Sequence, residues 1–399
     1  MMQNTLLDKP CSLINSRSRQ RKLALCAFYL VAASAVSMRV SHANQVFVHP
    51  GGVNGKAELE QVRQRIQGDA SLWSSTGKYA PLRALATPYV KTQAPCNLQR
   101  CEEEAKADAK KAYANALAWY YTGEAQYADN AMQVFRIWAN DFEGYKVVPG
   151  ISGQSQLNAG WIGALLGSAA EVLRSYSGWS HKEQAAVKSL FATRFYPALH
   201  QASEWNGNND LTQIDALMSI AVFSENEAWL NEAKDRLHRR NPRFFYLPSD
   251  VGIDHRSTNP SWFSPMRWVA GVTQETCRTN AKLPNDNGHH TQYAMASALR
   301  AAEVAWNQGD RSVYGLNQLR YTAAMELLAL QVLSGDMQGV CADPKTTASL
   351  FDTWMIGYNH YYRRMGIPLP NTQKLLRNSE SRVFKSDWNI FYESLTHGD

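Results

Sequence analysis

The sequence lacks the motifs of several large protein classes. It has no Gly-rich phosphate-binding loop, no Walker pattern and no basic-aromatic RNA motif, so nothing in it indicates nucleotide or nucleic-acid binding. Beyond residue 43, no stretch approaches the roughly 18 apolar residues that a transmembrane helix needs. Strand patterns are sparse, and only 244–247 and 388–392 resemble short extended pieces. What remains is a chain of 399 residues, 45% of them hydrophobic, as is typical of a folded globular protein.

The first 43 residues have the layout of a secretory signal peptide. A basic stretch at 17–22 (RSRQRK) precedes an apolar run at 23–38, and small residues occupy both ends of Ser41-His42-Ala43. This order predicts cleavage after Ala43, and an uncleaved N-terminal anchor is the alternative. We therefore expect a signal peptide at 1–43 and one mature domain at 44–399. That domain is expected to be periplasmic or secreted, and free of the membrane after cleavage.

The net charge is also small once the leader is set aside. The whole chain has a formal charge of +6, but residues 1–43 hold six Lys and Arg residues against Asp8 alone. Without them, 35 basic and 34 acidic residues remain, a formal charge of +1. Attraction for an acidic polymer must therefore come from a few local groups and not from a field over the whole protein.

Cysteines are few, and four remain after the leader: Cys96, Cys101, Cys277 and Cys341. An even number in an exported chain favours disulfides. Of the three possible connectivities we prefer Cys96–Cys101 with Cys277–Cys341. A zinc site is the alternative, but no pair of C-x-x-C units supports it. We expect neither a metal nor a cofactor.

Helical periodicity runs through most of the mature chain. Ala131, Val134, Phe135 and Trp138 follow the i, i+3, i+4, i+7 rule, and the pair Ser180/Glu183 matches a capping box. Periodicity alone supports a large all-α protein. Helix hairpins of similar size in succession suggest a single α/α toroid or incomplete barrel. The long irregular stretches 141–158 and 241–290 are expected to lie over its central cleft.

Two polar clusters could carry chemistry. The segment 204–210 (EWNGNND) precedes an amphipathic helix, and its amides could bind a carboxylate at the helix N-terminus; plain capping is the alternative. The second cluster is QETCR (274–278) followed by GHHTQY (288–293), where an arginine, two histidines and a tyrosine form a candidate acid/base site. His255 and Arg256 either join this site or are solvated.

These segments resemble the alginate lyase superfamily of polysaccharide lyases over roughly residues 46–395. The matching segments, in chain order, include HPG (49–51), ALAWYYTGEAQYADNA (116–131), NGN (206–208), QETCR (274–278), GHHTQY (288–293) and AAEVAWNQG (301–309). The resemblance implies an α/α toroid that cleaves uronic-acid polysaccharides by β-elimination. Two departures stand out, because the segment 279–287 is longer than in relatives and Asn209 replaces a histidine found in some of them.

The resemblance also assigns roles to residues. The asparagine that neutralises the substrate carboxylate falls on Asn208, the arginine on Arg278, the histidine on His290 and the catalytic tyrosine on Tyr293. Either Tyr293 or a histidine would be the base. Further candidates for substrate binding are His289, Asn209, Trp205, His255, Arg256, Gln156 and Trp262. Trp161 is expected to be a core residue.

The expected partner is an acidic polysaccharide, with no nucleic acid, and the chain is expected to be a monomer. Mannuronate-rich alginate is the first substrate hypothesis, and β-1,4-glucuronan is the alternative. Two other functional classes stay open. A glycoside hydrolase on the same toroid would need two carboxylic acids across the cleft, and a non-catalytic polysaccharide-binding protein would need only aromatic platforms.

Overall fold

A computed structural model describes residues 46–89, 102–145, 153–256, 265–278, 288–334, 339–342, 350–378 and 385–398. In these ranges the regular structure is helical, and the β-pairs are isolated bridges. The helices are α1 (Lys56–Gly68), α2 (Ala80–Leu85), α3 (Glu102–Thr122), α4 (Ala125–Asp141), α5 (Gln154–Leu173), α6 (His181–Leu190), α7 (Tyr196–Leu199), α8 (Gly207–Ser224), α9 (Glu227–Phe244), α10 (His289–Asn307), α11 (Ser312–Ser334), α12 (Met355–Tyr358), α13 (Pro370–Asn378) and α14 (Glu393–Thr396). No described helix is both long and apolar enough to span a bilayer.

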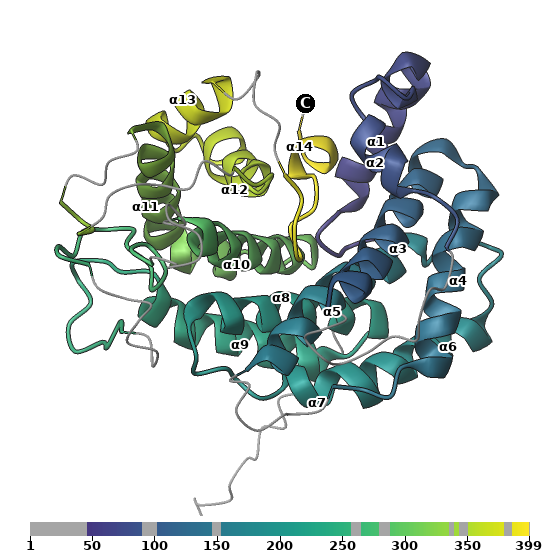
Figure 1. Cartoon of the computed structure of the whole chain (residues 1–399), viewed down its shortest axis with the longest axis horizontal. Coiled ribbons are helices and arrows are strands. Elements are labelled where there is room, and N and C mark those ends of the chain that lie inside the picture. Colours follow the sequence, from purple (N-terminus) through teal and green to yellow (C-terminus); the bar gives the residue numbers. More distant parts are fainter. Residues whose placement is uncertain are drawn as a thin grey trace, which may run out of the picture. The chain divides into compact units, whose positions relative to one another are not determined.

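An inner row of helices forms the centre of the fold. α3 packs on α5, α5 on α8, and α8 on α10 (Figure 1). α5, α8 and α10 are buried almost all round, as expected for helices with neighbours on every side. Close approach is possible because α5 carries small residues. A Cβ added at Gly167, for example, would lie 2.8 Å from the Cβ of Ser219 on α8.

An outer row covers the inner one. α4 packs on α3, α9 on α8, and α11 on α10, and each outer helix buries a single face. The predicted stripe of Ala131, Val134, Phe135 and Trp138 is the buried face of α4. The alternation of inner and outer helices confirms the predicted α/α toroid. The capping box of Ser180 and Glu183 opens α6 as predicted.

The two irregular stretches are shorter than the sequence indicated. The first ends at Gly153, because Gln154 already belongs to α5. The second starts only after Phe244, because α9 continues through Pro242. Pro242 donates no backbone hydrogen bond, but it lies in the last turn, so the hydrogen-bond ladder is interrupted only at the end of the helix.

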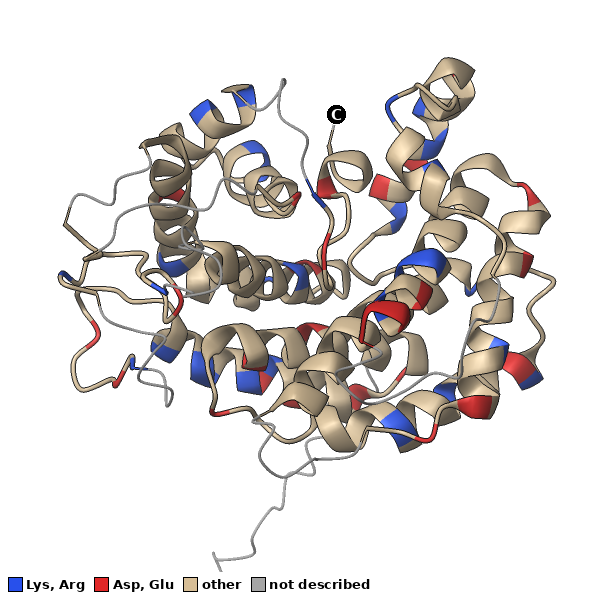
Figure 2. Cartoon of the chain, viewed as in Figure 1, with Lys and Arg blue, Asp and Glu red and all other residues tan. Residues whose placement is uncertain are grey.

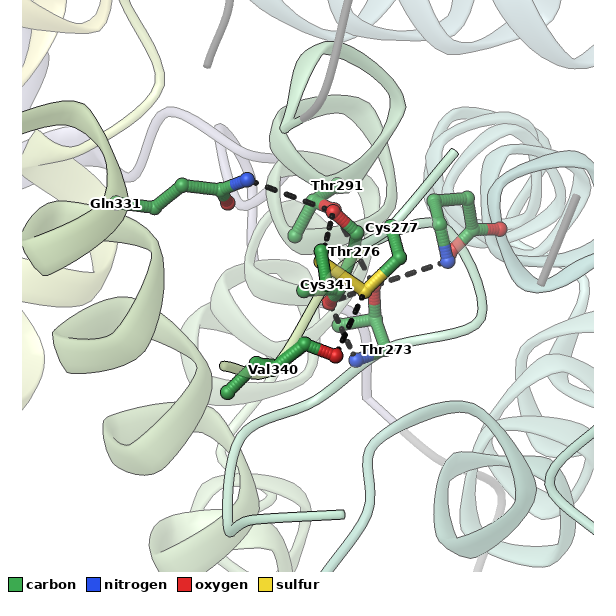
Figure 3. Close-up of a disulfide and its surroundings, with 8 residues drawn as sticks. Thr273, Thr276, Cys277, Thr291, Gln331, Val340 and Cys341 are labelled. Carbon is green, nitrogen blue, oxygen red and sulfur yellow. Dashed lines mark hydrogen bonds between the residues drawn. A yellow bond between two sulfur atoms is a disulfide. The ribbon is translucent and has the colours of Figure 1, made fainter. Parts of the chain in front are cut away.

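The Cys277–Cys341 disulfide is present, as predicted. It ties the segment that ends in Arg278 to residues 339–342 (Figure 3). The same segment is fastened to the first turn of α10, where the Thr273 and Thr291 hydroxyls lie 3.3 Å apart. The other expected pair, Cys96–Cys101, lies outside the described residues.

Candidate active site

A pocket of about 240 Å³ opens where the inner helices begin. Its walls come from the N-terminal parts of four helices and from three further residues. The residues that line it are Glu102 on α3; Gln154, Leu157 and Trp161 on α5; Asn206, Asn208 and Asn209 at the start of α8; His290 on α10; and Trp205, Arg278 and Trp388. The pocket therefore gathers residues from positions 102 to 388 of the sequence.

The positive ends of several helix dipoles meet at this pocket. α5, α8 and α10 each have a residue of their first turn in its wall, and a helix N-terminus carries about half a positive charge. α5 and α10 start after Gly153 and Gly288, and neither start has a capping side chain. Lys and Arg, in contrast, are dispersed over the described helices (Figure 2). The helix starts therefore give the pocket a local positive potential, which favours an anion.

The start of α8 uses its three asparagines in different ways. The Asn206 side chain caps the helix by accepting a 2.8 Å hydrogen bond from the backbone N–H of Asn209. The Asn209 amide donates to the carbonyl of Gly153 at 3.3 Å. The side chain of Asn208 is 1% exposed, and within the described residues neither its Nδ2 nor its Oδ1 has a hydrogen-bond partner. A buried amide in this state is costly unless a ligand satisfies it.

Glu275 lies directly behind Asn208. Its Oε1 accepts a 2.7 Å hydrogen bond from the backbone N–H of Asn208. Burial raises the pKa of this carboxyl to about 7, although the hydrogen bond from Asn208 acts in the opposite direction. Glu275 therefore fixes the backbone of Asn208. It does not bind the side-chain amide of Asn208, which stays in the pocket wall.

Arg278 and His290 meet across the pocket. The Nη1 atom of Arg278 contacts the His290 ring. Burial lowers the pKa of His290 well below its ordinary value, and Arg278 and His289 lower it further. Burial also lowers the pKa of His289, to about 4. Both imidazoles are therefore neutral near pH 7, and each has one ring nitrogen that can accept a proton.

Tyr293 lies one turn further along α10 and is fully buried. Its ring stacks on Trp388 with 3.8 Å between ring centroids, and its hydroxyl donates to Asp387 at 3.3 Å. Trp388 and His290 line the pocket, whereas Tyr293 is not among the described lining residues. The tyrosine adjoins the pocket through these two neighbours, with 6.1 Å between the Tyr293 and His290 ring centroids.

The candidates for substrate binding divide into two groups. Trp205, Asn209 and, next to His290, His289 are at the pocket or in contact with its wall. Gln156 is half-buried on α5, but Gln154 and Leu157 supply the described wall instead.

His255 and Arg256 lie in other surroundings. His255 is buried beside Tyr246 and Trp268, and exposed Arg256 pairs with Asp254 at 2.9 Å. The structure does not bring either residue into the described pocket wall. Trp262 lies outside the described residues.

Sequence reasoning missed several residues of the site. Trp161, expected in the core, lines the pocket and stacks on Trp388 at 4.5 Å. Glu102 and Gln154 are joined by a 2.9 Å hydrogen bond in the same wall. Their position in a first helical turn is a signal that could have indicated them. Trp388 has no such signal, because its segment reads only as a short extended piece. Among the described residues, no three His, Cys, Asp or Glu side chains are grouped to hold a metal ion.

Comparisons with known proteins agree with this architecture. Residues 60–243 match the family model for alginate lyase. Alginate lyase A1-III from Sphingomonas species A1 has a TM-score of 0.60 and 14% identity, over 89% of this chain and 98% of that one. A tyrosine-to-phenylalanine variant of alginate lyase A1-III, complexed with tetrasaccharide, has a TM-score of 0.61 and 16% identity, over 89% and 97%. An alginate lyase from Bacteroides ovatus has a TM-score of 0.56 and 12% identity, over 88% and 99%. No curated protein sequence matches the chain.

Proposed function

We propose that this polysaccharide lyase cleaves mannuronate-rich alginate by β-elimination. Residues 60–243 match the alginate lyase family, and the fold is that of alginate lyases. The product would carry a 4,5-unsaturated uronate at its new end. β-1,4-Glucuronan is the alternative substrate. The predicted export signal would place the enzyme in the periplasm or outside the cell.

The observation that carries the proposal is the unsatisfied Asn208 amide in an anion-binding pocket. A uronate carboxylate bound there would accept a hydrogen bond from Asn208 and would face both Arg278 and the start of α8. These donors are strongest when the carboxylate gains charge, which happens as the neighbouring C5 proton is removed. The same groups therefore bind the substrate and stabilise the enolate-like transition state.

The reaction needs a base at C5 and an acid at O4. The C5–H bond breaks, and its electron pair is delocalised into the neighbouring carboxylate as an enolate. This pair forms the C4–C5 double bond as the C4–O4 bond breaks, and O4 leaves with the bonding electrons and takes a proton. Tyr293 is the preferred base and acid, because its ring stacks on Trp388 of the pocket wall and lies 6.1 Å from the ring of His290. Neutral His290 is the other candidate base.

A glycoside hydrolase is less consistent with the described pocket. Glu204 binds Arg240 and Arg243, Asp210 binds Arg236, and Asp254 binds Arg256. Glu275 is engaged behind Asn208. Glu102 is the one acid among the described lining residues, whereas a hydrolase needs a pair.

The test is an ultraviolet assay of unsaturated product with mannuronate-rich alginate, guluronate-rich alginate, glucuronan and hyaluronan. We expect the largest rate with the first, and Tyr293→Phe should remove turnover while leaving binding largely intact. Near-normal turnover in that variant would exclude Tyr293 as the catalytic residue. Saturated products would indicate a hydrolase, and binding without any turnover on all four polymers would indicate a carbohydrate-binding protein.

A further inference from the structure

Four consecutive residues, Asp387 to Ile390, form a turn beside the active site. The backbone N–H of Ile390 donates to the carbonyl of Asp387 at 2.8 Å, which closes the turn. The turn is about 90 residues beyond Tyr293 in the sequence, yet its side chains contact Tyr293, the pocket wall and the inner helices.

Asn389 and Ile390 anchor the turn to the inner helices. The Asn389 amide is fully buried and donates to Asp215 on α8 at 3.1 Å and to Ser297 on α10 at 3.0 Å. Ile390 packs in a small apolar cluster with Tyr293 and Phe351. The turn is therefore fixed to the same two helices that present Asn208 and Tyr293.

Trp388 occupies the middle of an aromatic group. Its ring stacks on Tyr293 at 3.8 Å and on Trp161 at 4.5 Å. Its backbone has a φ of 48°, in the left-handed region that side chains other than Asn and Asp rarely adopt. Such a conformation persists where the surroundings hold it, and it is concentrated at functional sites. Here it turns the indole into the pocket wall, against the ring of Tyr293.

Asp387 binds the functional atom of the tyrosine. Its Oδ2 accepts the 3.3 Å hydrogen bond from the Tyr293 hydroxyl. Its Oδ1 accepts from the backbone N–H of Trp388 at 2.8 Å and lies 3.9 Å from the Nζ atoms of both Lys106 and Lys110. The carboxylate is therefore held from three sides. A phenol has a single proton to donate, so donation to Asp387 determines where the oxygen lone pairs point.

We propose that Asp387 is a positioning residue for Tyr293, and that the turn Asp387–Ile390 is part of the active site. Asp387 directs the phenolic proton, and Trp388 and Ile390 hold the ring. The proposal rests on the proposed function, in which Tyr293 reacts at C5 and O4. It adds to that function a carboxylate that sets the direction and the ionisation of the tyrosine.

The charged groups around this hydroxyl determine the expected pH effect. Asp387 is the acid that contacts it, with Lys106 and Lys110 of α3 behind the carboxylate and His289 and His290 on α10 beside the ring. A neighbouring anion raises the pKa of a phenol, because the phenolate would carry a like charge. Asp387→Asn removes that charge but keeps an oxygen that can accept the hydrogen bond.

The experiment compares Asp387→Asn, Asp387→Ala and the exposed control Asp69→Asn in the pH dependence of kcat and kcat/KM. For Asp387→Asn we expect the limb that reports Tyr293 ionisation to move to lower pH by at least about one unit, the effect of a unit charge at this distance in water, because burial lowers the effective dielectric constant and enlarges the effect. The limb should move to lower pH whether Tyr293 acts as base or as acid. Asp387→Ala should lower kcat at least tenfold with a nearly unchanged KM, and Asp387→Asn should recover part of this loss.

A second readout does not depend on turnover. Tyrosinate formation is followed by ultraviolet difference titration in the wild type and in Asp387→Asn, each after subtraction of the matching Tyr293→Phe background. A lower pKa for Tyr293 in Asp387→Asn supports the proposal even if no substrate is turned over, in which case the proposed function alone fails. An active wild type with the same titration and pH profile as Asp387→Asn would overturn the proposal and leave the function intact.

Discussion

Two asparagines at the start of α8 should respond to truncation in opposite ways. Asn206 caps the helix through the backbone N–H of Asn209, whereas no described residue satisfies the buried amide of Asn208. The backbone N–H of Asn208 keeps its hydrogen bond to Glu275 when the side chain is shortened. Asn208→Ala therefore removes the amide without removing the contact that fixes the helix start, and Asn206→Ala is its matched control.

The magnitudes follow from these contacts. Loss of an N-cap costs about 1 kcal/mol, so Asn206→Ala should lower the free energy of unfolding by that amount. A buried polar group without a partner costs about 1–3 kcal/mol. Asn208→Ala relieves this cost but loses some packing, so its free energy of unfolding should be unchanged or higher by about 1 kcal/mol. Its turnover should fall by about 10²–10³, as for loss of one oxyanion donor.

Urea unfolding followed by circular dichroism measures the first quantity, and initial rates of unsaturated product measure the second. The combination of lower activity with retained or higher stability is the expected signature of Asn208→Ala. If Asn208→Ala were destabilised as much as Asn206→Ala and still turned over at the wild-type rate, the amide would be a structural group and our reasoning about the pocket would be wrong.

Two further predictions concern the segment behind the site. Burial raises the pKa of Glu275 from its ordinary 4.5 to about 7, so its contribution to stability is complete below about pH 4.5 and is lost as the pH rises through about 7. Glu275→Gln should match the wild type near pH 4 in urea unfolding and exceed its stability above pH 7 by up to about 3 kcal/mol; a constant difference at all pH values would contradict this. The Cys277–Cys341 bridge closes a sequence separation of 64 residues, so Cys277→Ser/Cys341→Ser should lose about 4 kcal/mol of stability. The double variant keeps only the predicted Cys96–Cys101 pair, so reductant should destabilise the wild type by about this amount more than the double variant, and an equal effect on both would refute the assignment.

Most of the fold could be predicted from the sequence, because the patterns that indicate its helices are local. The stripe at Ala131 to Trp138 predicts the buried face of α4, and the pair Ser180/Glu183 predicts the start of α6. The placement of inner against outer helices is not local. It depends on close approaches such as that of Gly167 to α8, which no periodicity encodes.

Only part of the candidate site could be predicted from the sequence. Asn208 and His290 come from polar segments at helix starts, Arg278 comes from the irregular segment QETCR, and all three line one pocket. Their catalytic roles stay predictions. Trp388 could not be inferred, because an aromatic residue in a short irregular segment is equally compatible with core, surface and site. Trp161, expected in the core, is only 2% exposed, and yet it borders the pocket.

The helix N-termini around the pocket attract anions through groups that do not ionise. These groups are the backbone amides at the starts of α5 and α10, which have no pKa in the range where histidines and carboxylates change charge, whereas the start of α8 is bound by the titratable Glu275. Substrate capture should therefore vary less with acidity than turnover does. Because amides are present whatever the side chains are, substitutions could retune the chemistry of this pocket while its preference for acidic sugars persisted.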